Sequence, residues 1–310
     1  MTVCGWIALA GACSSTTRVA VPVELPNAAD RTPPVEGWRW ESSRGIEVAV
    51  PGDWAINDSG CNQTDAPSVV RGKGSSLDCL TFEPLTKQIV EIIPDEPGGS
   101  PPEGAEIEDV TIDDQPAQRA VGETPDGRAA GWLHIPGLHV LVRARVRDDE
   151  MLQRILDSVR VVDVDHNGCA AARADLEPTA PTAKTLLPTH SNALSVCFYG
   201  GGEVLESSAL LEGDAHDAVI ALLDGAKSGR NPDVPANRCS RTDEVPPADL
   251  VLVAHAASEH AAAEVWFSGC THRGISNGRT TVQLSIAALD AIMKPLHRGY
   301  GYNPSGLPKR

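Results

Sequence analysis

The chain has 310 residues, with 42 acidic and 26 basic side chains, and a formal net charge of -16 at pH 7. This length exceeds the usual size of a single domain, so two domains are expected. The negative charge excludes a sequence-independent grip on nucleic acid, because such binding needs Lys and Arg to neutralise phosphate. The scarcity of aromatic residues (4%) and the abundance of Gly and Pro (28 and 24) favour short strands and turns.

The N-terminal segment holds a short apolar run, Trp6 to Ala12, that ends at Cys13. The sequence Leu9-Ala10-Gly11-Ala12-Cys13 resembles the lipobox of bacterial lipoproteins. In that family a signal peptidase cuts before the cysteine, and the cysteine receives diacylglycerol. The family usually has leucine three positions before the cysteine, where this chain has Ala10. The resemblance implies a signal peptide over residues 1–12 and a lipid anchor on Cys13.

The residues around this motif set further expectations for an anchored protein. Residues 13–36 lack periodicity and carry several prolines, which predicts a flexible tether. No Lys or Arg precedes the apolar run, although export signals begin with positive charge, so we expect translation to start upstream of Met1. After Cys13 no apolar run approaches the roughly 20 residues that span a bilayer. We therefore expect the protein on the extracytoplasmic face of the cell membrane, held there by its lipid.

Cysteine usage predicts disulfides. Of eight cysteines, Cys4 leaves with the signal peptide and Cys13 is lipidated, and the remaining even number in an exported chain indicates disulfide bonds. A zinc site is the competing interpretation, but no pair has the close spacing that zinc ligands need. We expect no metal and no cofactor. The order of the cysteines favours pairing between neighbours: Cys61 with Cys79, Cys169 with Cys197, and Cys239 with Cys270.

The N-terminal half reads as strands followed by one helix. Order is expected from Trp38, and alternation over residues 45–51 predicts a half-buried strand. Asp148 or Asp149 is placed to cap a helix, because a carboxylate at that position accepts the free amides of the first turn. The apolar stripe of this helix has the spacing of one buried face: Leu152, Ile155, Leu156 and Val159. Further strands are expected at residues 88–93, 110–112, 130–134 and 139–147.

This order of strands closed by an amphipathic helix and the segment Asp157 to Val162 resembles the PsbP-like fold of many exported bacterial lipoproteins. The resemblance covers roughly residues 38 to 165 within a domain at 37–168, and it implies no catalytic residues. The chain as a whole, with Gly37-Trp38-Arg39-Trp40 and Ser268-Gly269-Cys270, is similar to exported lipoproteins of high-GC actinobacteria. That likeness implies a location in the cell envelope and does not imply an activity.

The C-terminal half shows the same alternation of strands and helices. Residues 169–190, rich in Ala, Pro and Thr, predict an interdomain linker, and residues 298–310 a tail. The domain between them, 191–297, has expected strands and helices at the following places: strands at 194–199, 204–211, 249–256, 263–269 and 280–284, and helices after Asp214 and Ser285. The predicted fold class is therefore α+β, with two small domains, each a mainly antiparallel sheet with one or two packed helices.

Two groups of residues have the types that metal or catalytic chemistry needs. Asp163 to Gly168 matches the opening of an EF-hand calcium loop, but the twelfth position is Ala174 instead of a bidentate glutamate. We interpret the segment as a polar turn, with a weak calcium site as the alternative. His255 and His260 would share a metal only if a hairpin brought them to one side. The run Ser258-Glu259-His260 is interpreted as a hairpin turn, because adjacent residues rarely form a triad.

Other polar and aromatic features allow both a structural and a binding interpretation. The row Trp38, Trp40, with Trp54 soon after, suits core packing, or stacking on a glycan if exposed. The row Arg143, Arg145, Arg147 suits a solvated sheet face or an anionic ligand. Gly200 to Gly202 is interpreted as a hairpin turn instead of a nucleotide loop. Residues 270–278 are interpreted as a turn, since Asn277-Gly278 is a strong hairpin signal, or as a disulfide-pinned ligand loop.

The leading functional hypothesis is a non-enzymatic, lipid-anchored module that binds or scaffolds another envelope component, either a protein or a glycan. One alternative is an envelope hydrolase with His255, Glu259 and His260 as its only candidate machinery. Another is small-ligand binding in the groove between the domains, where sites often form. We assign no catalytic residue, because no candidate has a partner at the spacing that its chemistry requires.

The lipid anchor is tested by replacing Cys13. In the native host, with the upstream start included, Cys13→Ser removes the acylated thiol and should abolish labelling by palmitate. The protein should then appear in the medium or stay unprocessed. Cys4→Ser is the matched control, because it changes a cysteine inside the expected signal peptide and should leave labelling intact. Labelling that survives Cys13→Ser would show that the anchor is not there.

Overall fold

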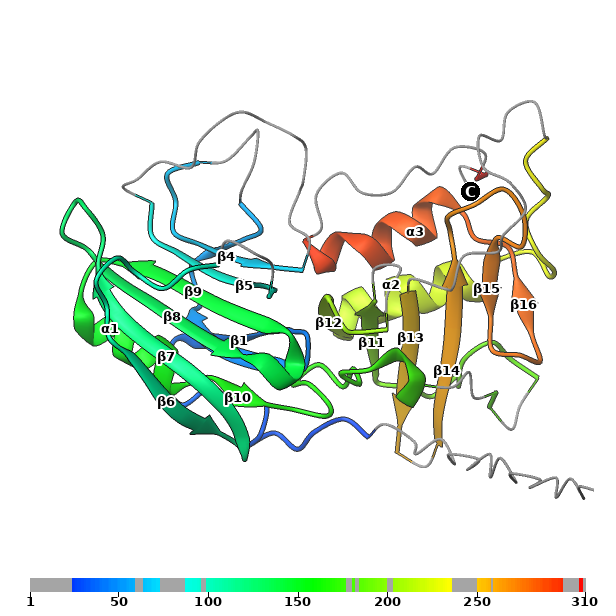
Figure 1. Ribbon diagram of the computed structural model, residues 1–310. Coiled ribbons are helices and arrows are strands. Elements are labelled where there is room, and N and C mark those ends of the chain that lie inside the picture. Colours follow the sequence, from blue (N-terminus) through cyan, green and yellow to red (C-terminus); the bar gives the residue numbers. More distant parts are fainter. Residues whose placement is uncertain are drawn as a thin grey trace, which may run out of the picture.

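A computed structural model describes most of the chain beyond the N-terminal segment: residues 24–58, 64–72, 87–95, 99–176, 180–181, 184–199, 203–235, 250–257, 259–297 and 307–308. Within these ranges the elements form three sheets and three α-helices, and most strand pairs are antiparallel (Figure 1). The predicted α+β class is therefore confirmed, while the division into two domains stays a prediction. Some predicted site cysteines lie outside the described residues: Cys13, Cys61, Cys79 and Cys239.

The N-terminal half contains a seven-stranded sheet. Its strand order is β3 (Ala55–Ile56), β4 (Ser68–Arg71), β5 (Ile89–Pro94), β9 (Val140–Val146), β8 (Ala129–Ile135), β7 (Gln115–Glu123) and β6 (Ile107–Ile112). The pairs β3–β4 and β4–β5 are parallel, and the other pairs are antiparallel. A short 3-10 helix, η2 (Pro136–Leu138), joins β8 to β9.

A second layer packs on one face of this sheet. It consists of the helix α1 (Asp149–Asp157) and a three-stranded antiparallel sheet of β1 (Trp38–Ser43), β2 (Ile46–Pro51) and β10 (Arg160–Val161). Asp148 accepts a hydrogen bond from the Met151 amide, which confirms the predicted cap. Leu152 and Leu156 of α1 leave no room beside Gly131 of β8, where a Cβ would lie 2.7 Å from Leu152. A larger residue at this crossing of helix and sheet would therefore have to displace the ends of the Leu152 and Leu156 side chains.

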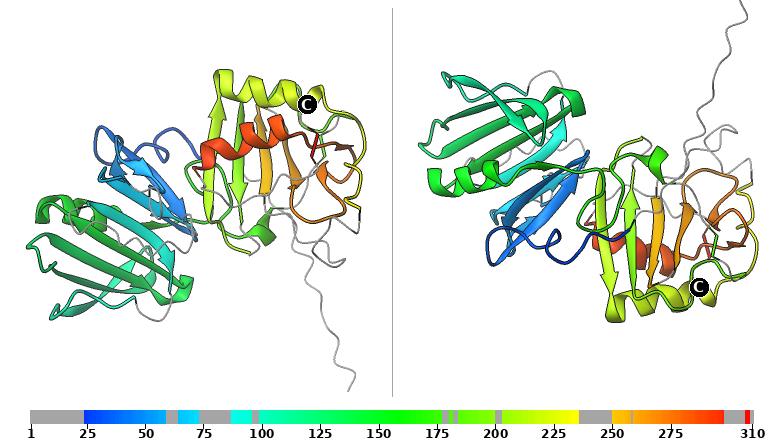
Figure 2. Two further views of the ribbon diagram at one scale, coloured as in Figure 1. Left: turned by 90° about the horizontal axis from the view of Figure 1, so that it is seen from above. Right: turned by 90° about the horizontal axis from the view of Figure 1, so that it is seen from below.

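The C-terminal half is a six-stranded antiparallel sheet with helices on one face. The strand order is β12 (Ser207–Glu212), β11 (Ala193–Phe198), β13 (Leu250–Ala256), β14 (Glu259–Trp266), β15 (Gly274–Ser276) and β16 (Thr281–Val282). The helices α2 (Gly213–Asp224) and α3 (Ile286–Met293), followed by the 3-10 helix η5 (Lys294–Leu296), share a hydrophobic core with the alternate residues of β11 and β13. Ser285 caps α3 by accepting the Ala288 amide, as predicted. The two halves lie side by side (Figure 2).

The other face of the six-stranded sheet is covered by residues 162–176, here called the connector, which include the 3-10 helix η3 (Arg173–Asp175). The predicted disulfide between Cys169 and Cys197 is confirmed, and both residues are fully buried. Tyr199, also fully buried, donates its hydroxyl proton to the Ala170 carbonyl. Cys270 is disulfide-bonded as well, but its expected partner lies outside the described residues. The connector, which begins inside the expected N-terminal domain and continues into the expected linker, is thus packed against the C-terminal sheet.

Several elements differ from the sequence-based expectations. The strand β14 begins at Glu259, because the ladder with β13 continues to the pair Ala256–Glu259 and leaves only two residues for the turn. Glu259 and His260 therefore belong to a strand, and the hairpin-turn interpretation is wrong for them. The sequence predicts only a strand at residues 110–112 in the region where the structure has the hairpin of β6 and β7. The rest of this hairpin is largely exposed and shows little alternation of apolar and polar residues, so the sequence gives no strand signal there. Residues 24–36, expected in the tether, contact the fold through Asp30 and Arg160.

None of the helices in the described part of the chain combines the length and the apolar character needed to cross a membrane.

Candidate functional site

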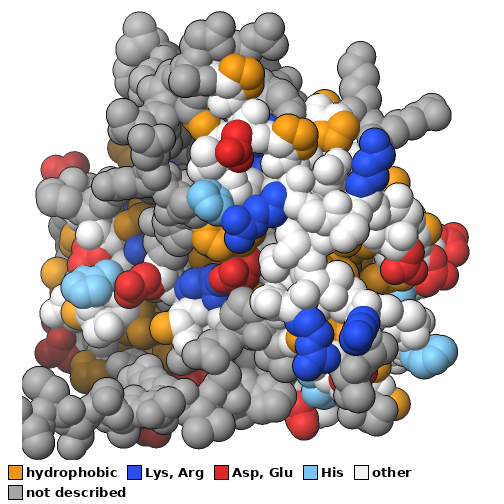
Figure 3. All heavy atoms as spheres, turned by 90° about the vertical axis from the view of Figure 1, so that its right-hand side faces the viewer, with side chains coloured by type: hydrophobic (Ala, Val, Ile, Leu, Met, Phe, Trp, Pro, Cys, Tyr) orange, Lys and Arg blue, Asp and Glu red, His pale blue; other side chains and the backbone are white. Residues whose placement is uncertain are grey.

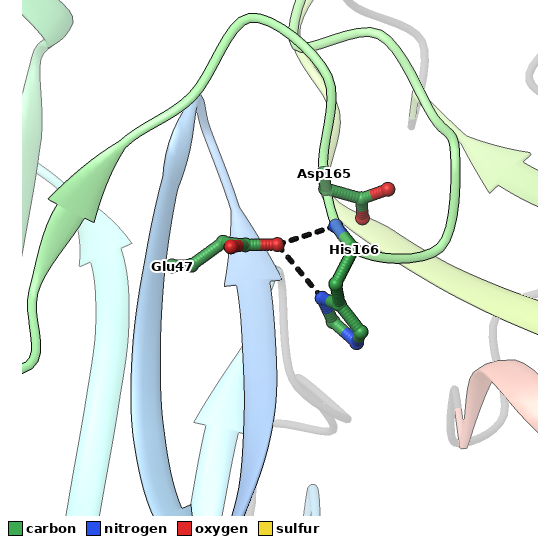
Figure 4. A group of neighbouring side chains, drawn as sticks. All are labelled: Glu47, Asp165 and His166. Carbon is green, nitrogen blue, oxygen red and sulfur yellow. Dashed lines mark hydrogen bonds and ion pairs between the residues drawn. The ribbon is translucent and has the colours of Figure 1, made fainter. Parts of the chain in front are cut away.

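A cluster of buried charged side chains lies where β2 meets the connector, and Figure 4 shows its centre. Glu47 is fully buried and points from β2 toward the connector. Its Oε1 accepts hydrogen bonds from the His166 backbone amide at 2.6 Å and from His166 Nδ1 at 2.8 Å. Its Oε2 receives the Arg160 guanidinium, with Nε at 2.6 Å and Nη2 at 2.5 Å. Glu47 thus holds the connector through both of its oxygens.

Asp165 is the second buried carboxylate, and its side chain points away from Glu47 (Figure 4). Its Oδ1 accepts the amides of Asn167 at 3.1 Å and Cys169 at 2.8 Å. Its Oδ2 accepts the hydroxyl protons of Ser42 on β1, at 2.5 Å, and of Ser208 on β12. One carboxylate therefore joins the connector to a strand from each half. We call Ser42, Asp165 and Ser208 the carboxylate junction.

The charges around Glu47 compensate one another. Burial acts to raise the pKa of the Glu47 carboxyl, but the hydrogen bonds and charges of His166 and Arg160 outweigh burial, so the pKa lies below its ordinary value. Arg160 also stacks on Trp40, with its guanidinium carbon 4.0 Å from the ring centroid. Such cation–π contacts strengthen when they are shielded from water. The arrangement keeps Glu47 ionised inside the fold and gives Trp40 a structural role.

A second buried ion pair lies nearby. Arg71 of β4 donates from Nε to Glu41 of β1 at 2.6 Å, and from Nη2 to the Ser208 carbonyl at 3.3 Å. Arg39 donates to the other oxygen of Glu41 at 2.6 Å. Burial acts to raise the pKa of Glu41, and the two guanidinium groups outweigh it and lower the pKa. The pair connects the seven-stranded sheet, β1 and β12, so it reinforces the carboxylate junction.

Glu47, Asp165 and His166 bring three possible metal-ligand atoms within 4.8 Å of one another. Their oxygens, however, already accept hydrogen bonds, and Arg160 supplies a positive charge where a cation would have to bind. The EF-hand-like segment is therefore a polar turn, closed by a hydrogen bond from the Gly168 amide to the Asp165 carbonyl, with Gly168 at a φ of 78°. The structure supports the turn interpretation over the calcium alternative.

A serine–histidine contact lies beside this turn, on the connector face of the six-stranded sheet. Ser195 Oγ is 2.7 Å from His255 Nε2, and Ser195 donates its hydroxyl proton to the Asn167 carbonyl. Ser195 has no exposed surface. His255 Nδ1 is buried, and no carboxylate in the described part of the chain bonds to it. This pair lacks both an accessible nucleophile and the acid that orients a catalytic histidine, so the hydrolase alternative gains no support here.

His255 and His260 are directly opposite one another on β13 and β14. Their ring centroids are 5.7 Å apart, and the ring planes meet at 70°. The sequence predicted this proximity only on the condition that a hairpin placed both residues on one side, and the ladder meets that condition. Ser258 lies outside the described residues.

A concavity with a volume of about 640 Å³ lies on the seven-stranded sheet. Arg143 lines it with an ion pair to Glu91, Nη2 to Oε2 at 2.9 Å, and its Nε is buried without a hydrogen-bond partner. Trp132 donates from its indole nitrogen to the Gly99 carbonyl at 2.6 Å. The remaining lining residues are mainly acidic, basic or small: Ile89, Ser100, Pro102, Glu103, Glu123, Thr124, Pro125, Ala130, Gly131, Ala144 and Arg145.

A smaller cavity of about 320 Å³ lies between the N-terminal segment, the β6–β7 turn and the connector. Its lining includes three acidic side chains, Asp30, Asp113 and Asp163, and also Arg160 and His166. Asp113 accepts the Val161 amide at 2.8 Å, so part of this acidic surface is used to hold the connector.

The remaining sequence candidates have mostly structural contacts. Trp40 and Trp54 are buried and Trp38 packs on the core, which favours the packing interpretation over glycan stacking. Arg147 pairs with Asp148, as a solvated face would. Asn277 forms the β15–β16 turn, and its side chain donates to the Leu186 carbonyl. Gly200 to Gly202 lie outside the described residues.

Comparison with known proteins gives no identification: no family model, no curated protein and no solved structure matches this chain significantly.

The carboxylate junction is tested by Asp165→Asn. The amide replaces one acceptor oxygen with a donor, so at least one buried donor loses its partner, and the free energy of unfolding should fall by about 1–3 kcal/mol. Asp163→Asn is the matched control, because Asp163 is exposed two residues away and should change stability by less than about 0.5 kcal/mol. Urea unfolding of both variants measures the difference. Equal stability of the two variants would contradict the role of Asp165.

The buried state of His255 predicts a loss of stability in acid. Burial, assisted by the charges of His260 and Arg31, lowers the pKa of His255 from 6.5 to about 4. Below pH 6.5 His255 is therefore protonated in the unfolded chain but stays neutral in the folded chain. The free energy of unfolding that His255 contributes above pH 6.5 is lost as the pH falls toward 4. Between pH 7 and 4.5 this loss amounts to about 2–3 kcal/mol.

Urea unfolding at these two pH values should therefore show a smaller loss for His255→Gln than for the wild type. Glutamine retains an amide donor for Ser195 but does not titrate, and the carboxylates contribute equally in both proteins. An identical pH dependence of the two proteins would mean that His255 titrates normally in the fold.

Proposed function

We propose that this protein is a non-enzymatic binding or scaffolding module, anchored by a lipid on Cys13 at the extracytoplasmic face of the cell membrane. The lipobox-like sequence and the disulfide between Cys169 and Cys197 support export, since such bonds persist in oxidising compartments. The observation that carries the binding role is the concavity on the seven-stranded sheet. Its volume of about 640 Å³ falls within the usual range for ligand sites.

The chemistry of the concavity defines the kind of ligand. Basic and acidic side chains both line it: Arg143 and Arg145, together with Glu91, Glu103 and Glu123. Such a mixed lining offers hydrogen-bond donors and acceptors at close range and favours a polar ligand over a strongly charged one. Arg143 is the central residue, because its side chain is 41% exposed and its buried Nε still has a donor to offer.

The binding face is thus a local feature, and the overall acidity of the chain does not define it. Figure 3 shows the end of the molecule that carries β15 and β16, where acidic, basic and hydrophobic side chains of the described residues are interspersed. A mixed surface of this kind is typical of solvated protein. The concavity is a defined hollow, so we place the contact with an envelope protein or glycan there.

Site-specific photo-crosslinking in intact cells tests this proposal. A photoreactive residue at Ser100, which lines the concavity and is exposed, should give a discrete adduct with the envelope component. The same residue at Asp217, exposed on α2, is the control for random encounter. Arg143→Ala should reduce the Ser100 adduct several-fold, whereas Arg147→Ala should not, because Arg147 follows the end of the same strand and does not line the concavity. Equal adducts in both variants, or from both positions, would refute the proposal.

A further inference from the structure

We infer that His255 and His260 form a binding site for a divalent first-row transition metal, of the class of Cu²⁺, Ni²⁺ and Zn²⁺. The first observation is their placement. Residues directly opposite in an antiparallel ladder have Cβ atoms about 5 Å apart, and here the ring centroids are 5.7 Å apart. Two imidazoles that share an ion with bonds of about 2.1 Å have centroids roughly 4.5–6 Å apart. The spacing of the two rings therefore lies within the range that a shared ion requires.

The second observation is that both rings present an unused nitrogen. The Nδ1 atoms of His255 and His260 are buried, and neither has a hydrogen-bond partner. Buried polar atoms are nearly always paired, so two unpaired ring nitrogens on facing residues require an explanation. His255 itself is 4% exposed, which places its Nδ1 in a protected environment.

The third observation is that the structure fixes which nitrogen of His255 carries the proton. The Ser195 hydroxyl donates to the Asn167 carbonyl, so it receives a hydrogen bond from His255 Nε2. The proton is therefore on Nε2, and Nδ1 carries a lone pair. Metal-binding histidines typically donate their other ring N–H in this way, which orients the ring and raises its basicity. Ser195 is thus a positioning residue for His255.

The donor set determines the class of ion. Neutral imidazole suits copper, nickel and zinc, whereas calcium and magnesium require oxygen ligands. Among these ions the affinity for Cu²⁺ should be the highest. This site is separate from the buried cluster of Glu47, Asp165 and His166, whose oxygens are already used. It is also independent of the proposed binding concavity, which lies on the other sheet.

Titration of the tag-free chain with Cu²⁺, followed by isothermal calorimetry, tests the inference. The wild type should bind one ion saturably. His260→Gln should weaken that binding at least about tenfold, because even loss of an outer hydrogen bond weakens metal sites by 10–100-fold. His272→Gln is the matched control, since His272 is an exposed histidine on another loop and should bind as the wild type does.

Two further measurements keep the test decisive. Circular dichroism of His260→Gln verifies that the variant is folded, and electron paramagnetic resonance of the Cu²⁺ complex should show coupling to two nitrogens in the wild type. Binding that is equal in His260→Gln, or no saturable binding by the wild type, would overturn the inference and leave the two Nδ1 atoms to a buried water.

Discussion

The Asp165 carboxylate is the interaction on which the arrangement of the molecule depends. A buried carboxylate is strongly unfavourable unless hydrogen bonds replace its lost water. Asp165 meets this condition with donors from two different sheets, Ser42 of β1 and Ser208 of β12, and with two amides of its own turn. Separating the two halves would remove one of the two serine donors from a charge that has already lost its water. The connector is therefore a fixed part of the structure in this region.

The other buried charges follow from the same constraint. Glu47 is satisfied by Arg160 and His166, and Glu41 by Arg71 and Arg39, so each carboxylate has cationic or potentially cationic neighbours. Buried ion pairs of this kind contribute little net stability, but breaking one by removing a partner is strongly destabilising. Their consequence here is geometric: the polar groups beside the connector are committed to holding strands in place.

The sequence predicted local features well where the signal lies within a few residues. The helix α1 was predicted from the cap at Asp148 and its apolar stripe, and the β15–β16 turn from Asn277-Gly278. The sequence did not predict the start of β14 correctly. The pairing of His260 with His255 depends on the partner strand and not on the alternation of apolar residues alone. The EF-hand likeness of residues 163–168 has a physical origin, since an aspartate that accepts amides of its own turn and a glycine at positive φ occur in both structures.

The partners of Asp165 could not be found in this way, because Ser42 is 123 residues away and serine is common on polar strand faces. Hydrogen-bond accounting in three dimensions shows which buried polar groups are satisfied. Every oxygen of Asp165 and Glu47 is paired, whereas several buried nitrogens have no hydrogen-bond partner, among them Trp40 Nε1, Arg71 Nη1, Arg143 Nε and the Nδ1 atoms of His255 and His260. Of these, Arg143 lines a concavity, and the two histidines lie opposite one another in a strand ladder. An unpaired buried group raises the free energy of the folded state unless something binds to it. For Arg143 the occupant that we propose is a polar ligand of the concavity, and for the two histidines it is a transition-metal ion.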